Sequence, residues 1–167
     1  MSIKNYSKES KLLAIWGLIT TLIVILDQWV KYWIVLNLSL YEKININFFI
    51  NITHQQNTGA AFSILADAGG WQRWFLSVLA ILVCGYIIHW LYQLRTTSQW
   101  YLSYGLSFVL GGALGNVIDR IRLGYVVDYA QVFINGWPFP SFNVADAAIT
   151  LGAVLIIIDA IINKELH

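Results

Sequence analysis

The sequence predicts an all-α membrane protein with four transmembrane helices and a small extracytoplasmic β-sheet lying on the membrane surface. Of its 167 residues, 58% are hydrophobic and 11% are charged, whereas a soluble domain carries about a quarter charged residues. Residues 74–94 and 96–118 contain no Lys, Arg, Asp or Glu, and each run exceeds or matches the roughly 20 residues that a spanning helix needs. A strictly alternating segment around residue 48 predicts the sheet.

Four apolar segments predict the helices, at about residues 12–36, 72–94, 99–119 and 143–162. They form a single membrane domain over residues 1–167, with long connections at about 37–71 and 120–142. The first segment resembles a signal peptide, but no small-residue cleavage site follows it, so we expect a retained helix. In the third segment, Gly111 and Gly115 have the GxxxG spacing that permits close helix packing.

The distribution of basic residues predicts which connections lie outside the cell membrane. Lys4, Lys8 and Lys11 precede the first helix. They favour a cytoplasmic N-terminus, because the first helix usually sets the orientation. Four antiparallel spans then place both termini inside and both long connections outside. The unusual polar residues therefore gather at the outer face.

The first outer connection alternates between apolar and polar residues from Ile44 to Thr53. Strict alternation predicts a strand with one buried face. An isolated strand with open edges cannot lie in hydrocarbon, so we expect a small sheet whose apolar side faces the lipid. Tyr125–Ile134 in the second connection is a candidate partner strand, and Asn135-Gly136 after it is typical of a hairpin turn.

Polar clusters lie at the outer ends of the apolar segments, where ionisable groups are candidates for function. They are Asp27 with Lys31, Asn57 with Gly59, Asn116 with Asp119 and Arg120, Asp128, and Asn143 with Asp146. Structural roles are possible for each. Asp27 and Lys31, four residues apart, could form a local ion pair. Asn143 could cap the fourth helix with Asp146 in its first turn, and Asp128 could be a solvated loop residue.

Together, Asp128 and Asp146 indicate acid–base chemistry. Seventeen uncharged residues separate them in the sequence, and both belong to the outer-face clusters. Two neighbouring carboxylates cannot comfortably both ionise, so they share a proton. One can then activate a water molecule while the other protonates a leaving amine. The N-terminus of the fourth helix favours a charged Asp146, which makes Asp128 the expected proton holder.

Other function classes are less well supported. The net charge of +1 and the scattered basic residues argue against nucleic-acid binding. Cys84, His54 and His89 do not stand at metal-ligand spacing, so no metal or other cofactor is expected. A proton-coupled transporter would need polar groups through the membrane depth, and the second helix offers only His89 as a relay group. A scaffold subunit would not need Asp, Asn and Arg on one face.

The same residues form ordered blocks that resemble bacterial lipoprotein signal peptidase, also called signal peptidase II. The blocks are Asp27-Gln28 with Lys31, Asn57-Thr58-Gly59-Ala60-Ala61-Phe62, Gly111-Gly112-Ala113-Leu114-Gly115-Asn116 with Asp119-Arg120, Val127-Asp128-Tyr129, and Phe139-Pro140 with Phe142-Asn143-Val144-Ala145-Asp146. They follow the family order over nearly the whole chain, which makes the match specific. Tyr129 is a departure, because phenylalanine is common there.

The resemblance implies an intramembrane aspartyl endopeptidase of the bacterial inner (cytoplasmic) membrane. That family removes the signal peptide from prolipoproteins by cutting before a cysteine that carries diacylglycerol. Globomycin-type cyclic peptides inhibit it, and it needs no metal. By this resemblance Asp128 and Asp146 are the catalytic pair. The implied substrate-binding or supporting residues are Asp27, Lys31, Asn57, Gly59, Asn116, Asp119, Arg120 and Asn143. Prolipoproteins and membrane lipids are the expected partners of a monomer.

Overall fold

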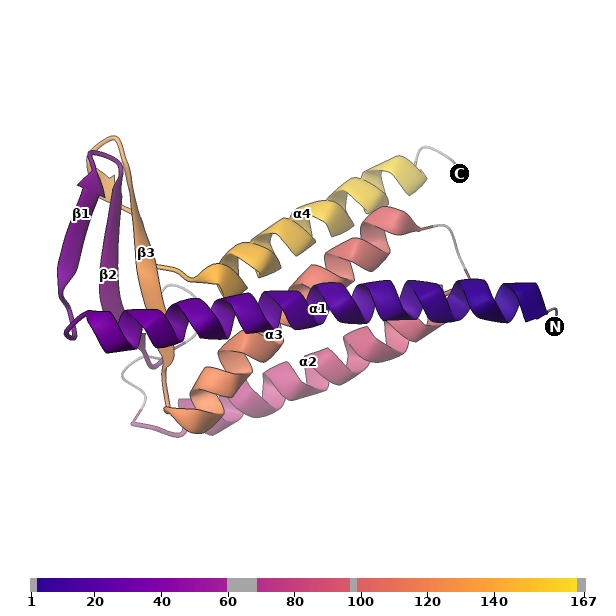
Figure 1. The fold of residues 1–167 in the computed structure, drawn as a ribbon, viewed down its shortest axis with the longest axis horizontal. Helices are drawn as coiled ribbons and strands as arrows, with labels where there is room; N and C mark the ends of the chain where they lie inside the picture. Colours follow the sequence, from indigo (N-terminus) through magenta and orange to yellow (C-terminus); the bar gives the residue numbers. More distant parts are fainter. Residues whose placement is uncertain (1–2, 60–68, 97–98, 165–167) are drawn as a thin grey trace.

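The computed structural model describes residues 3–59, 69–96 and 99–164, and in these it contains four long helices and a four-stranded sheet (Figure 1). The helices are α1 (Ile3–Asn37), α2 (Gln72–Leu94), α3 (Trp100–Arg122) and α4 (Val144–Lys164). Each contains a stretch long and apolar enough to cross a membrane. The predicted four-helix membrane fold is therefore confirmed.

Two helix boundaries differ from the prediction. The first helix begins at Ile3 and not near residue 12. The added turns before residue 12 consist mainly of polar residues. One of these, Glu9, forms an ion pair from its Oε2 to Nε of Arg95, which follows the end of α2, at 3.2 Å. The third helix runs to Arg122, three residues past the predicted end. Apolar periodicity misses such polar extensions, because tertiary contacts stabilise them.

The sheet stands at the end of the bundle where α1 ends and α4 begins (Figure 1). The start of α1 and the end of α4 lie at the opposite end of the bundle. This is the arrangement expected of four antiparallel spans. Which end faces the cytoplasm stays a prediction.

The third helix is the centre of the bundle. Of its apolar stretch, 61% is buried inside the protein, against 17%, 22% and 22% for α1, α2 and α4. The three helices around it, α1, α2 and α4, consequently expose most of their apolar side chains. Such exposure suits a lipid environment, because hydrocarbon around the helices removes the penalty that water would impose.

Glycines bring α3 close to α1, as the GxxxG spacing predicted. A Cβ atom built on Gly111 would lie 2.9 Å from the Cβ of Ile23. One built on Gly115 would lie 2.6 Å from Oδ2 of Asp27. Both positions therefore exclude larger residues. At Gly115 the backbone of α3 lies directly against the Asp27 side chain of α1.

A second glycine seam joins α3 to α4, and the sequence analysis missed it. Gly105 of α3 faces Gly152 of α4, where an added Cβ would lie 2.8 Å from the Gly152 carbonyl oxygen. Seven residues further along α3, a Cβ on Gly112 would overlap the carbonyl oxygen of Ala145. The seam has a seven-residue spacing, so it lacks the GxxxG pattern.

The sheet is antiparallel in the order β1-β2-β3-β4. Its strands are β1 (Lys43–Asn47), β2 (Ile50–Asn57), β3 (Val126–Ile134) and β4 (Trp137–Pro138). The prediction of one strand for the alternating segment is therefore wrong, because the segment forms the β1–β2 hairpin. Asn47 Oδ1 accepts the N–H of Phe49 at 2.8 Å, and this side-chain turn reverses the chain. Asn135 and Gly136 both have positive φ at the β3–β4 turn, as predicted.

The two faces of the sheet differ in exposure. The strand register places Ile44, Ile52 and Ala130 in one row, and Asn51 and Gln131 in the next row on the other face. Asn51 and Gln131 are each 8% exposed, whereas Ile44 is 41% exposed. Val127 and Tyr129 lie on the buried face too, where they pack with Ile34 of α1 and with Leu38 just after its end. The exposed apolar face suits the predicted contact with lipid.

We expect Gly112→Ala to destabilise the protein by about 1–3 kcal/mol, because its Cβ must push α3 away from α4. Gly85→Ala in α2 is the matched control, since a Cβ there meets nothing within 4 Å. The control should be neutral or stabilising by up to about 1 kcal/mol, as expected from helix propensity. The free energy of unfolding in detergent micelles measures both. Equal values for the two variants would show that the seam tolerates a methyl group.

Candidate active site

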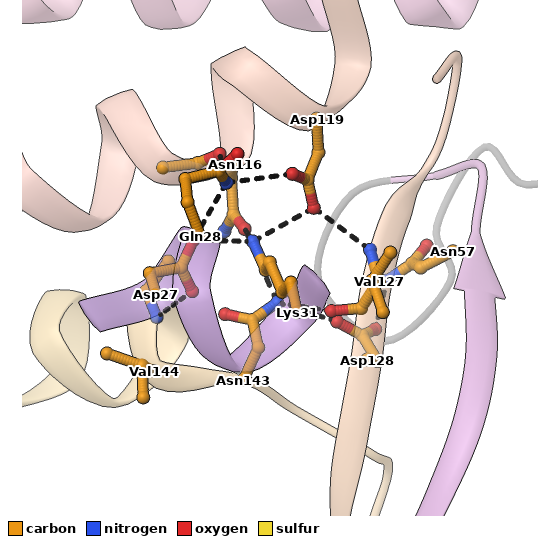
Figure 2. Close-up of polar contacts among 12 residues, drawn as sticks. Asp27, Gln28, Lys31, Asn57, Asn116, Asp119, Val127, Asp128, Asn143 and Val144 are labelled. Atoms are coloured by element: carbon orange, nitrogen blue, oxygen red, sulfur yellow. Dashed lines mark hydrogen bonds and ion pairs between the residues drawn. The ribbon is translucent and has the colours of Figure 1, made fainter. Parts of the chain in front are cut away.

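A buried lysine is the centre of the polar cluster (Figure 2). Lys31 is 3% exposed. Its Nζ lies 2.8 Å from Asp27 Oδ2, 3.0 Å from Asp119 Oδ2 and 3.0 Å from Asn116 Oδ1. These contacts match the three donors of an ammonium group. The predicted ion pair with Asp27 is present, but it is not merely local, because the same ammonium also binds α3.

The two carboxylates that bind Lys31 also hold backbone groups of other elements. Asp27 Oδ1 accepts the N–H of Ala145, in the first turn of α4, at 2.9 Å. Asp119 Oδ2 accepts the N–H of Val127, on β3, at 3.1 Å. Gln28 donates from Nε2 to Asp119 Oδ1 at 2.9 Å. The cluster therefore joins α1, α3, α4 and β3.

Asn143 caps α4 and holds Asp146. Its Oδ1 accepts the N–H of Asp146 at 2.9 Å, and Asp146 Oδ2 accepts the N–H of Asn143 at 3.2 Å. This reciprocal pair resembles a capping box. Asn116 Nδ2 donates to the other oxygen of Asp146 at 2.9 Å. The capping role considered from the sequence is therefore real, and it fixes Asp146 within the cluster.

The third strand brings Asp128 to the same place. Asn143 Nδ2 donates to Asp128 Oδ1 at 2.8 Å, and Asn57 Nδ2 donates to Asp128 Oδ2 at 3.1 Å. Asn143 thus contacts both aspartates. Burial of Asp128, and secondly the nearby charge of Asp146, raise the pKa of Asp128 to about 7. A group with this pKa can hold a proton near neutral pH, in keeping with the expectation for Asp128.

Arg120 connects the last turn of α3 to the end of β2. Its Nη2 donates to the carbonyl oxygen of Gly59 at 2.9 Å, and Gly59 N–H in turn binds Asn57 Oδ1 at 3.0 Å. Arg73 holds the same turn from α2, donating to the carbonyl oxygens of Arg120 and Ile121 at 2.7 and 2.6 Å. The sequence analysis missed Arg73, because its partners are backbone atoms 47 and 48 residues away.

Tyr129, the departure from the family pattern, links β3 to α4. Its hydroxyl oxygen accepts the N–H of Val144 at 3.2 Å. Burial raises the pKa of Tyr129 to about 12, so the hydroxyl keeps its proton at neutral pH. The bond joins the residue after Asp128 to a residue two before Asp146. It adds a direct tether between the two segments that carry these aspartates.

Hydrogen bonds and ion pairs bring every predicted site residue into this region of the protein. They are Asp27, Lys31, Asn57, Gly59, Asn116, Asp119, Arg120, Asp128, Asn143 and Asp146. Residues 60–62 of one matched block lie outside the described residues. Over the described ranges, no group of three or more His, Cys, Asp or Glu could hold a metal ion. The arrangement places two carboxyl groups, Asp128 and Asp146, on the same asparagine, Asn143, among buried amide donors.

Comparisons with known proteins agree with this architecture. A sequence model of the family described as "Signal peptidase (SPase) II" matches residues 19–162. The lipoprotein signal peptidase of Pseudoalteromonas atlantica is 45% identical over 96% of this chain and 96% of its own. That of Alteromonas mediterranea is 47% identical over 95% and 85%. A solved bacterial membrane enzyme, determined by the in meso method at 2.3 Å, superposes with a TM-score of 0.79 at 31% identity, covering 90% of each chain.

We expect Lys31→Met to destabilise the protein by about 3–5 kcal/mol, because it leaves two buried carboxylates without their cation. Adding Asp27→Asn should recover part of the loss, since an amide oxygen can still accept the Ala145 N–H. Lys43→Met, at an exposed position of β1, is the control and should change stability by no more than about 0.5 kcal/mol. Unfolding in detergent micelles measures all three. A Lys31→Met protein as stable as the control would contradict the central role of this ion cluster.

Proposed function

The chain belongs to the signal peptidase II family of bacterial membrane peptidases, and from this premise we propose that it is an aspartyl endopeptidase of lipoprotein maturation. Its proposed substrates are prolipoproteins, cut just before a cysteine that carries diacylglycerol. The observation that carries the proposal is the placement of Asp128 and Asp146 around Asn143, which binds both. The two aspartates come from different elements, and both lie in a buried polar network.

In the proposed reaction, Asp146 is the base and Asp128 holds the proton. Asp146 takes a proton from a water molecule, whose oxygen attacks the scissile carbonyl carbon, while Asp128 gives its proton to the carbonyl oxygen. The C–N bond then breaks, and the proton on Asp146 passes to the leaving amine of the cysteine. Asp128 recovers a proton from the hydroxyl group as the new carboxyl group forms. One water molecule is consumed for each peptide bond cut.

Polar groups beside the aspartates support an extended substrate backbone in the proposed site. A peptide that enters a membrane-buried site must find partners for its N–H and C=O groups. Asn57, Asn116 and Asn143 provide amide groups there. Arg120 Nε is buried and has no hydrogen-bond partner in the part of the chain that the structure describes. We assign it as a donor to a substrate carbonyl oxygen.

We further propose that the chain is a monomeric single-domain protein of the bacterial inner membrane. Both termini would be cytoplasmic and the site would open at the outer face. The start of α1 and the end of α4 lie at the end of the bundle opposite the sheet, as this topology requires (Figure 1). A signal peptide anchored in the bilayer would then present its scissile bond at the outer interface. Globomycin-type cyclic peptides would compete with it for the site.

We expect Asp128→Asn and Asp146→Asn each to lower kcat by about 10²–10⁴-fold, the usual contribution of a general acid or base. The assay is cleavage of a diacylglyceryl-modified prolipoprotein by the purified enzyme, and globomycin should block the wild-type reaction. Asp159→Asn is the control. Asp159 is a buried carboxylate that accepts the N–H of Leu102 near the start of α3, a role that an amide can keep. Near-normal turnover by either site variant would refute the catalytic pair.

The pH dependence should report the proton on Asp128. Because its pKa is about 7, kcat/KM should fall as pH rises through about 7 and the pair loses its proton. Asn57→Ala removes a hydrogen bond that favours the charged form of Asp128, so its pKa should rise and the fall should move to higher pH. Gln55→Ala, opposite Asp128 in the strand register, is the control and should leave the midpoint in place. A shift to lower pH in the Asn57 variant would contradict this assignment.

A further inference from the structure

We propose that the apolar face of the β2–β3 pair binds the diacylglyceryl chains of the substrate. The proposal rests on the proposed function, since it assumes that a lipid-bearing cysteine follows the scissile bond. The strip in question consists of Ile50, Ile52, Ala130 and Val132, called here the apolar strip. Ile52 pairs with Ala130 and Ile50 pairs with Val132, so the four side chains share one face of the sheet.

The apolar strip is continuous with the candidate active site. Asp128, Ala130 and Val132 alternate along β3, so their side chains leave the strand on the same side. The distance from Asp128 to Val132 along the strand is about 13 Å, at about 3.3 Å per residue. One leaflet of a hydrocarbon core about 30 Å thick measures roughly 15 Å. A chain of membrane length that starts beside Asp128 could therefore lie along the whole strip.

Burial in the sheet indicates what covers this face. Ile50 is 38% exposed and Val132 is partly exposed, whereas Ile52 and Ala130 are partly buried against the protein core. Asn51, Thr53 and Gln131 on the other face are buried. The protein itself covers the other face through Val127 and Tyr129, and exposure of the apolar strip to water is unfavourable, because apolar area gains from leaving water. Hydrocarbon is the environment in which its exposure is favourable. The strip therefore fits an acyl chain better than it fits a hydrated peptide.

Among the described residues, the helix side of Asp128 is closed to an acyl chain. In the proposed reaction the lipid-bearing cysteine follows the cut bond, so its side chain starts beside the aspartates. Toward the helices this space is closed by the buried charges and amides of Lys31, Asn116 and Asn143 (Figure 2), where an acyl chain would displace hydrogen bonds without replacing them. Along β3 the next residue on the face is Ala130, which is small and only partly buried.

The far end of the strip leads to further apolar surface. The β1–β2 turn carries Phe48 and Phe49, and beyond the β3–β4 turn stands Trp137, at 80%, 61% and 79% exposure. Figure 1 shows the two turns together at the end of the strands away from α1. Tryptophan side chains favour the interface between hydrocarbon and water. A lipid chain on the strip would thus pass from the site to a membrane-compatible rim.

The test compares two synthetic prolipopeptides of identical sequence, one with palmitoyl and one with hexanoyl chains on its diacylglyceryl cysteine, at equal mole fraction in mixed micelles. The double variant Ile52→Thr with Val132→Thr keeps β-branched side chains but adds hydroxyl groups to the strip. We expect the ratio of kcat/KM for the long over the short substrate to fall about tenfold from its wild-type value, mainly through KM. This corresponds to about 1.4 kcal/mol.

Val35→Thr is the matched control, because it makes the same type of change at an exposed position of α1 and should leave the ratio unaltered. If the double variant lowers cleavage of both substrates equally, or of neither, the strip does not bind the substrate lipid and contacts only bulk membrane. If the wild-type enzyme cleaves neither substrate, the proposed function itself is wrong. The two failures are therefore distinguishable in one experiment.

Discussion

The end of the bundle that carries the sheet is assembled around one buried ammonium group. Lys31 binds Asp27 and Asp119, and each of these carboxylates uses its other contacts to hold a backbone N–H of a different element. Buried ions are stable only when their partners are complete, so the first turn of α4 and the start of β3 are located by the same charge. Close helix packing is part of this constraint, because Gly115 leaves the space that Asp27 occupies.

Structural roles and proposed catalytic roles coincide in the same side chains. Asn143 begins α4 as its cap, and the same amide donates to Asp128. Asn116 accepts from Lys31 and donates to Asp146. An asparagine can do both because its side chain has an acceptor oxygen and two donor hydrogens. The ion cluster and the proposed catalytic pair are thus one network, in which Asn57 and Asn143 hold Asp128 while Asn116 and Asn143 hold Asp146.

The sequence predicted those parts of the fold that depend on local pattern. Long uncharged runs located the helices, Asn135-Gly136 located a turn, and polar residues at helix ends located the candidate site. It failed where tertiary contacts decide. The alternation through Phe48 concealed a chain reversal, because Asn47 makes its turn without a glycine. The contacts of Arg73 with the end of α3, and the seam of Gly105 and Gly112 with α4, have no local signature. The catalytic roles of Asp128 and Asp146 stay predictions, carried by the family resemblance and supported by their geometry.

The glycine seam between α3 and α4 also fixes the position of α4 along its own axis. Ala145 rests on Gly112, and Asp146 is the next residue. Sliding α4 by one residue along its axis would carry that carboxylate about 1.5 Å, whereas reacting groups tolerate errors of about 0.5 Å. The absence of side chains at Gly105 and Gly112 therefore fixes the position of the Asp146 carboxylate along the axis of the bundle.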